Sequence, residues 1–323
     1  MHCELVVPGL LSKMAALRLP SLELLLARGR STRGEPKALE SWLHQAFQLD
    51  RQPLAAGALT LLAANGDPGE GVWLRADPVH LRLLRDRAVV VPAEALAVSA
   101  EEAASLCDSL GRHFRNSLFK AINPRRWCAR VEKDFPAGEQ PSIEAAGHEV
   151  MPARETDPFL NEAQMLLHAH PVNEAREARG EPAINSLWLW GAGRSPKPAG
   201  RWDSVLADEP IALALARLAG ARHRALPAGA DAWLERAPEE GRHLVILDSL
   251  RAPLALSEEA DYRERLERLE RDWFAPLLGA LRAGRVGMAT VHVPDGDASA
   301  SFETIRGDLR RFWRRPKALE SYT

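Results

Sequence analysis

The sequence predicts an α/β fold built on a largely parallel sheet. The C-terminal half alternates runs that have the apolar period of strands with runs that have the period of helices, which is the order expected when helices join parallel strands. Two of the strand runs, INSLWLW and HLVILDSL, are apolar on both alternating faces. This pattern is typical of strands covered on both sides of a sheet.

Apolar periodicity and turn residues then predict the elements of the N-terminal half in order. The first is a buried strand, CELVVPGLL, which Pro8 and Gly9 close. The segments that follow are helices at 12–28 and 36–48 separated by a polar loop at 28–37, strands at 57–65, 71–84 and 87–93, a helix at 99–114 with Ser99 as N-cap, and a strand at 125–132.

The polar stretch 133–157 is either a linker or a surface excursion. After it, the pattern predicts helices at 157–169, capped by Asp157, and at 171–180, capped by Asn173 and ended by Gly180. The remaining elements are strands at 184–190, 243–250 and 285–296, helices at 210–220 and 262–284, and a basic helix at 302–315. The region 58–132 is rich in strands, which suggests a cap or an insertion.

Charge and cysteine content narrow the function classes. The 42 Lys and Arg against 44 Asp and Glu give a net charge of −2, which argues against nucleic acid or an anionic membrane as a global partner. Three cysteines without a CxxC motif form no disulfide framework and suit a reducing compartment. No signal peptide and no apolar run of about 18 residues is recognisable. We therefore expect a cytoplasmic protein.

The segment HPVNEAREARGEPAINSLWLWGAG, at 170–193, concentrates directional side chains around one strand. Four polar residues flank the strand and could form a cradle for an anionic ligand: His170, Asn173, Arg176 and Asn185. Gly191 and Gly193 follow the strand, where α/β sheets place ligands, but the chain then enters prolines and not a helix. The alternative is that Asn173 only caps, Arg176 is solvated and the tryptophans are core; spacing alone favours this alternative.

Two further patterns suggest sites weakly. His168 and His170 form an H-x-H pair, but the pair straddles a helix end and no acidic or cysteine cluster lies nearby, so a metal site is not expected there. His292, Asp295 and Asp297 follow a strand and could form a carboxylate site, although Pro-Asp-Gly is also an ordinary turn.

The predicted terminal helix carries five arginines: Arg306, Arg310, Arg311, Arg314 and Arg315. Spacings of four and five residues place several of them on one side. This side could meet nucleic acid or an acidic protein partner, and the near-neutral chain favours a solvated face instead.

The 170–193 segment resembles the signature of archaeal-type cofactor-independent phosphoglycerate mutases, which carry H-x-x-N-x-x-R, then an alanine and an asparagine, then a strand end rich in tryptophan and glycine. Within that group the whole chain is most similar to the RpfE-type regulatory proteins of proteobacteria. The resemblance implies an alkaline-phosphatase-like fold: a mixed, mainly parallel sheet between helices. It also implies one domain over 1–323, with 58–150 as a possible inserted cap region.

The resemblance implies a site with two divalent metals and a serine nucleophile, but this sequence departs from that pattern. Pro8 stands where the family ends its first strand in aspartate. Asp248 lacks the histidine expected a few residues later, and His292 and Asp295 are spaced differently from the family's Asp-His pair. Ser31 is only a loop serine near the expected distance from the first strand. Without two cations, phosphoryl transfer loses its charge neutralisation.

The leading hypothesis is a mutase-like protein that has lost its two-metal site, holds no cofactor, and acts in regulation or in sensing a phosphorylated small molecule near His170, Asn173, Arg176 and Asn185. The alternative is an active mutase or phosphatase that holds Mn or Zn by an unconventional set: Asp248, His292, Asp295 and His170. A third hypothesis is a scaffold that binds a protein partner through the basic terminal helix.

Overall fold

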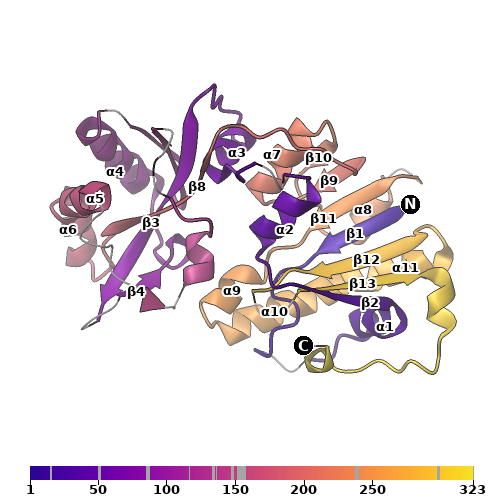
Figure 1. Ribbon diagram of the computed structural model, residues 1–323. Helices are drawn as coiled ribbons and strands as arrows, with labels where there is room; N and C mark the ends of the chain where they lie inside the picture. Colours follow the sequence, from indigo (N-terminus) through magenta and orange to yellow (C-terminus); the bar gives the residue numbers. More distant parts are fainter. Residues whose placement is uncertain are drawn as a thin grey trace. The chain divides into compact units, whose positions relative to one another are not determined.

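The computed structural model divides into two compact units (Figure 1). Unit 1 comprises Met1–Gln48 and Pro198–Thr323, and unit 2 comprises Leu49–Lys197. Unit 2 therefore contains the 58–150 stretch and extends beyond it on both sides; a cap role for that stretch stays a prediction. The structure describes all residues except 15–16, 50–51, 85–87, 116, 133–134, 136, 147–148, 151–157, 237–239, 297–298 and 323.

Unit 1 is built on a mixed sheet that has seven strands in the described part of the chain. In sheet order the strands are β10 (Arg222–Arg224), β9 (Ser204–Leu206), β11 (Arg242–Ile246), β1 (His2–Val6), β12 (Met288–Val293), β13 (Ser299–Ile305) and β2 (Arg30–Gly34). The first five are joined by parallel pairing, and β13 pairs antiparallel with both β12 and β2. The α/β class with a mixed, mainly parallel sheet is thus confirmed.

Helices and turns surround this sheet: α1 (Pro20–Arg28), α2 (Leu39–Ala46), α7 (Pro210–Leu218), α8 (Ala230–Leu234), α9 (Arg251–Ala255), α10 (Glu259–Leu269), a π-helical turn (Glu270–Phe274), α11 (Ala275–Ala283), and 3₁₀ turns at Arg306–Arg310 and Leu319–Ser321. One face of the sheet is apolar and packs against α1, α10 and α11 (Figure 1). Leu5 and Val291 lie in this core. Because side chains alternate along a strand, Glu4 and His292 belong to the opposite, polar face.

Unit 2 is built on an antiparallel sheet of six strands in the described residues: β3 (Val72–Leu83), β4 (Ala88–Val91), β5 (Leu118–Asn123), β6 (Arg126–Val131), β7 (Glu149–Val150) and β8 (Ser186–Gly193). Its helices are α3 (Ala56–Ala63), α4 (Ala100–His113), α5 (Pro158–His168) and α6 (Pro171–Ala178), with 3₁₀ turns at Ala93–Ala95 and Ser142–Ala145. Leu74 packs with α4 and α5 on one side of the sheet, and Trp73 packs with α3 on the other.

Several local predictions are confirmed. Ser99 caps α4 in a capping box with Glu102, because the serine hydroxyl accepts from the Glu102 N–H and the glutamate accepts from the Ser99 N–H. Gly180 ends its helix at φ +74°, and Gly284 ends α11 at φ +81°. Asp157, expected as a helix cap, lies outside the described residues.

Three element predictions are wrong. The expected strand at 57–65 is helix α3, which is buried almost all round, and a run that is apolar on every face carries no period that separates the two structures. The expected loop at 28–37 contains β2, an exposed edge strand paired with β13.

The expected basic helix at 302–315 is the third error. The segment begins as β13, in which Phe302 and Thr304 are buried and Glu303 and Ile305 are exposed, and it continues as a 3₁₀ turn. Period-two burial on a sheet outweighed the helical spacing of the arginines. Binding of a protein partner by this segment stays a prediction, although the α-helix expected to present its arginines does not form.

The helices of the described residues include none with the length and apolar character required to cross a bilayer.

Candidate functional site

The polar residues of the 170–193 segment are held mainly by contacts inside unit 2. Asn173 is buried: its side-chain amide donates to the carbonyls of Leu167 and Ile184 at 2.8 Å each, and its carbonyl accepts from the Ile184 N–H at 2.8 Å. The prediction that Asn173 caps this helix is therefore wrong. His170 caps α6 through Nδ1, which accepts from the Val172 N–H at 3.1 Å.

Arg176 is also fully buried and directed into the protein. Its guanidinium donates to the Pro182 carbonyl at 2.9 Å, to the Leu96 carbonyl at 2.5 Å and to the Glu102 carboxylate at 2.8 Å. Asn185 bonds both the N–H and the carbonyl of Leu81, at 2.7 and 3.0 Å. These side chains join α6 and β8 to α4 and β3, because a buried polar group is costly unless it is hydrogen-bonded.

The two glycines of the segment serve close packing. Gly191 has φ +62°, and a Cβ atom there would lie 2.4 Å from the Cβ of Ala56 in α3. A Cβ on Gly193 would lie 2.7 Å from the Cβ of Ala55. The buried Trp190 donates its indole N–H to Asp77 at 2.8 Å. The density of directional residues in this segment therefore has a structural explanation, and ligand binding by the set stays a prediction.

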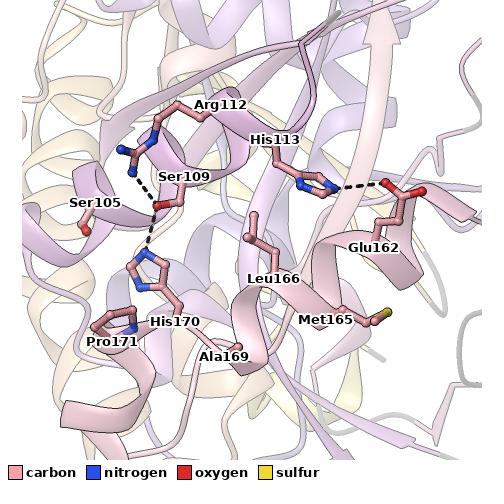
Figure 2. A pocket seen from close by; sticks show the side chains of 10 residues that line it. All are labelled: Ser105, Ser109, Arg112, His113, Glu162, Met165, Leu166, Ala169, His170 and Pro171. Carbon is pink, nitrogen blue, oxygen red and sulfur yellow. Dashed lines mark hydrogen bonds and ion pairs between the residues drawn. The ribbon is translucent and has the colours of Figure 1, made fainter.

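His170 differs from the other polar residues because it also lines a surface pocket, together with Ser109 and Arg112 of α4 (Figure 2).

The carboxyl edge of the parallel strands in unit 1 is the place where α/β sheets bind ligands. After β1, the carbonyl of Gly9 accepts from the Tyr262 hydroxyl at 2.8 Å. Beside this edge, Glu40 of α2 and Arg251 of α9 form a buried bidentate ion pair, with N–O distances of 2.9 and 3.1 Å. Both carboxylate oxygens of Glu40 thus accept hydrogen bonds from the Arg251 guanidinium.

Glu209 follows β9 at the same edge and caps α7. Its buried carboxylate accepts from the Ala212 N–H at 2.6 Å. Burial, with the nearby carboxylates of Glu40 and Asp248, raises the pKa of Glu209 to about 7. This carboxyl group therefore titrates near neutral pH, whereas an ordinary glutamate titrates near pH 4.5.

Asp248, His292 and Asp295 were the alternative metal ligands. Asp248 follows β11, and its backbone carbonyl accepts from the Arg251 N–H; Asp295 follows β12, and its backbone carbonyl accepts from the Lys37 N–H. Within the described ranges, no three His, Cys, Asp or Glu side chains are grouped so that they could hold a metal ion. At this edge the carboxylate of Glu40 is bound by a guanidinium and that of Glu209 by a backbone amide, and metal binding by Asp248, His292 and Asp295 stays a prediction.

His292 belongs instead to a charged cluster on the polar face of the sheet. Its Nε2 lies 3.1 Å from the carboxylate of Glu4, and its Nδ1 lies 2.9 Å from the Ser301 hydroxyl. Glu4 is also bound by Arg242 at 2.8 Å and Arg201 at 3.1 Å. Burial alone would raise the pKa of Glu4, but the hydrogen bonds from His292 and Arg242 and the charge of Arg201 outweigh it and hold the pKa at about 2.

A pocket of about 400 Å³ lies above this cluster. Among its lining residues are the cations Arg33, Lys37 and Arg201, and no Asp or Glu of the described chain is among them. The other lining residues are mostly small, hydroxylic or amide-bearing: Thr32, Gly34, Trp42, Gln45, Ala46, Gln48, His292, Val293, Pro294, Ser299, Ala300 and Ser301. We name it the polar-face pocket; its composition suits an anionic ligand.

Sequence reasoning missed most of these charged groups. Glu4 could have been recognised from the sequence, because it is a lone acidic residue in an otherwise apolar strand. Glu209 precedes Pro210, as an N-cap precedes a proline at the first helical position. The pairing of Glu40 with Arg251 could not have been recognised from local sequence, because 211 residues separate the two.

Comparisons with known proteins show which group the chain resembles. No family model matches it. The chain is 25% identical to the 2,3-bisphosphoglycerate-independent phosphoglycerate mutase of Methanosarcina acetivorans over 205 residues, 57% of this chain and 50% of the relative. It is 24% identical to the enzyme of that name from Methanosarcina mazei over 204 residues, with the same shares. The match thus spans about half the length of these curated relatives.

Comparison with solved structures concerns the fold. The PH0037 protein from Pyrococcus horikoshii has a TM-score of 0.58 at 15% identity, covering 94% of this chain and 87% of that one. A cofactor-independent phosphoglycerate mutase from Thermoplasma acidophilum has a TM-score of 0.48 at 19% identity, covering 95% and 90%. The chain is therefore homologous to the archaeal cofactor-independent phosphoglycerate mutases, and it shares its fold with the Pyrococcus horikoshii protein.

Proposed function

We propose that the protein is a mutase-like regulator of the RpfE type, which binds a phosphorylated small molecule in the polar-face pocket and does not carry out two-metal phosphoryl transfer. The observation that carries this proposal is the charge of the pocket. Three cationic side chains line it, and no described carboxylate does.

The carboxylate of Glu4 beneath the pocket does not cancel this charge. Arg201 and Arg242 both bind it, so the guanidinium groups of the cluster outnumber this carboxylate. Glu4 instead orients Arg201, whose Nη2 donates to it at 3.1 Å. An arginine held in this way keeps further N–H donors for a phosphate and loses less side-chain entropy when it binds one.

Hydroxyl groups complete the donor set. Thr32, Ser299 and Ser301 line the same pocket, and the buried Ser299 hydroxyl has no hydrogen-bond partner among the described residues. A phosphate oxygen would supply an acceptor to such a hydroxyl. Since the curated relatives are named for phosphoglycerate, a phosphorylated three-carbon acid is the first ligand to test.

The carboxyl edge of the sheet supports the proposed loss of metal chemistry. Phosphoryl transfer needs cations that neutralise the transferring group. At this edge the Glu40 carboxylate is bound to Arg251, and the Glu209 carboxylate caps a helix. Neither carboxylate is available to a metal without breaking those bonds, so we assign no catalytic step to them.

Calorimetric titration of the full chain with 3-phosphoglycerate, and with glycerate as the matched control, tests the ligand. We expect saturable binding of the phosphorylated acid and none of glycerate. Lys37→Glu and Arg33→Glu should abolish binding, whereas Arg236→Glu, an exposed change in unit 1 outside this pocket, should leave it unchanged. Equal binding by all three variants would exclude the pocket.

Elemental mass spectrometry of the same sample, followed by mutase and phosphatase assays with added manganese, tests the chemistry. We expect no stoichiometric metal and no turnover. Two bound metals with turnover would establish the alternative, an active metal-dependent mutase or phosphatase, and would overturn the proposed regulatory role.

A further inference from the structure

A second pocket, of about 670 Å³, lies in unit 2 between α4, α5 and the start of α6. Its lining residues are Ser105, Ser109, Arg112, His113, Glu162, Met165, Leu166, Ala169, His170 and Pro171. Its volume is that of a small-molecule site. We name it the α4–α5 pocket. Figure 2 shows Arg112 and His170 converging on Ser109, with Leu166 between this group and the His113–Glu162 pair.

The hydrogen bonds determine which nitrogen of His170 carries the proton. Nδ1 accepts from the backbone N–H of Val172, so this nitrogen holds no proton. The neutral ring must then be protonated at Nε2, which lies 3.0 Å from the Ser109 oxygen. His170 therefore donates to Ser109 and cannot take a proton from it, which rules out a serine–histidine nucleophile in this tautomer.

Two donors consequently point at the Ser109 oxygen. The second is Nη2 of Arg112, at 3.0 Å. A hydroxyl oxygen has two lone pairs and one proton, so with both lone pairs used Ser109 retains an O–H to donate. Burial and the charge of Arg112 lower the pKa of His170, which favours the neutral ring that this arrangement needs.

The pocket thus offers a hydroxyl donor beside a guanidinium. Arg112 is exposed, and the one hydrogen bond described for it uses Nη2 alone. An oxyanion placed here would accept from Ser109 and Arg112 together.

The rest of the lining restricts the ligand. Met165, of which 74% is exposed, lines the pocket with Leu166, Ala169 and Pro171, and these side chains are apolar. Glu162, which lies 3.1 Å from His113, places a negative charge on the far side of Leu166. A second anionic group on the ligand would meet this carboxylate, so the pocket favours one negative end and an apolar body.

We propose that the α4–α5 pocket binds a small apolar monocarboxylate, with its carboxylate on Ser109 and Arg112 and its apolar body against Met165 and Leu166. This site is separate from the polar-face pocket and takes a different class of ligand. Its outcome therefore does not depend on the proposed function.

Calorimetric titration of the full chain with octanoate tests the site, with octanamide as the uncharged control. We expect saturable octanoate binding that is about tenfold or more tighter than octanamide binding, because a charge-assisted hydrogen bond contributes that much. Arg112→Gln should weaken octanoate binding to the level of octanamide. Arg115→Gln, an exposed change two residues after α4 outside the lining, should have no effect.

Met165→Glu provides a second variant that spares the fold, because this side chain is largely exposed. It should abolish octanoate binding by adding a negative charge to the apolar wall. Absent octanoate binding, equal affinity for octanamide, or unchanged affinity in both Arg112→Gln and Met165→Glu would overturn the proposal. Thermal unfolding of each variant, monitored by circular dichroism, establishes that a lost affinity is not lost folding.

Discussion

Replacing Glu209 by glutamine should change how the stability of the protein depends on pH. The buried carboxylate has its pKa raised from 4.5 to about 7. Because the folded state holds the proton more tightly than the unfolded chain, this group contributes stability that is complete below pH 4.5 and is lost as the pH rises through 7. Each pKa unit corresponds to about 1.4 kcal/mol. The wild-type chain should therefore lose between about 2 and 3 kcal/mol from this group between pH 5 and pH 8.

Glutamine keeps an oxygen that can accept from the Ala212 N–H but carries no charge. Glu209→Gln should thus gain stability relative to wild type as the pH rises, by that same amount. Urea unfolding at pH 5, 6, 7 and 8, followed by tryptophan fluorescence, measures the difference. Glu235→Gln, an exposed change in the same unit, controls for general charge effects. A difference between Glu209→Gln and wild type that does not vary with pH would refute the reasoning.

Three further predictions concern structural residues and are checked by urea unfolding. Arg176→Met should destabilise unit 2 by about 3 kcal/mol or more, since it leaves two buried carbonyls and Glu102 without their donor; a loss below 1 kcal/mol would contradict the burial of this guanidinium. Gly191→Ala should cost more than Gly180→Ala: both glycines have positive φ, but a Cβ clashes only at Gly191, while nothing lies within 4 Å of one at Gly180. Equal losses would mean that helix α3 moves away freely. Glu4→Gln should destabilise the protein at pH 6 and much less at pH 3, because the pKa of Glu4 is lowered to about 2 and its contribution is lost as the pH falls from 4.5 towards that value; a loss independent of pH would argue against the ionised cluster.

Local sequence patterns were sufficient wherever neighbouring residues decide the structure. The α/β class, the buried strands β11 and β12, and the capping box of Ser99 and Glu102 all follow from periodicity or from residues within one turn. The H-x-x-N-x-x-R pattern beginning at His170 likewise pointed to the homology that the comparisons support.

Tertiary packing decided what the same residues do. From spacing alone, a helix cap at Asn173 and a solvated Arg176 were favoured over ligand donors. Only the positions of Leu96, Pro182 and Ile184 in the folded protein assign their hydrogen bonds. Helix α3 is a similar case. Its uniformly apolar sequence fits a strand as well as a helix, and its packing against β3 and β8 decides for the helix.

The candidate pockets depend still more on distant parts of the chain. Glu4 meets Arg201, Arg242 and His292, which lie 197, 238 and 288 residues away. No local pattern records such pairings, because the charge that a side chain meets is set by the order of strands in the sheet and not by its neighbours in sequence. The sequence by itself therefore determined the fold class and the kinship of this protein, and the tertiary structure alone decided which of its charges face a pocket and which neutralise one another inside.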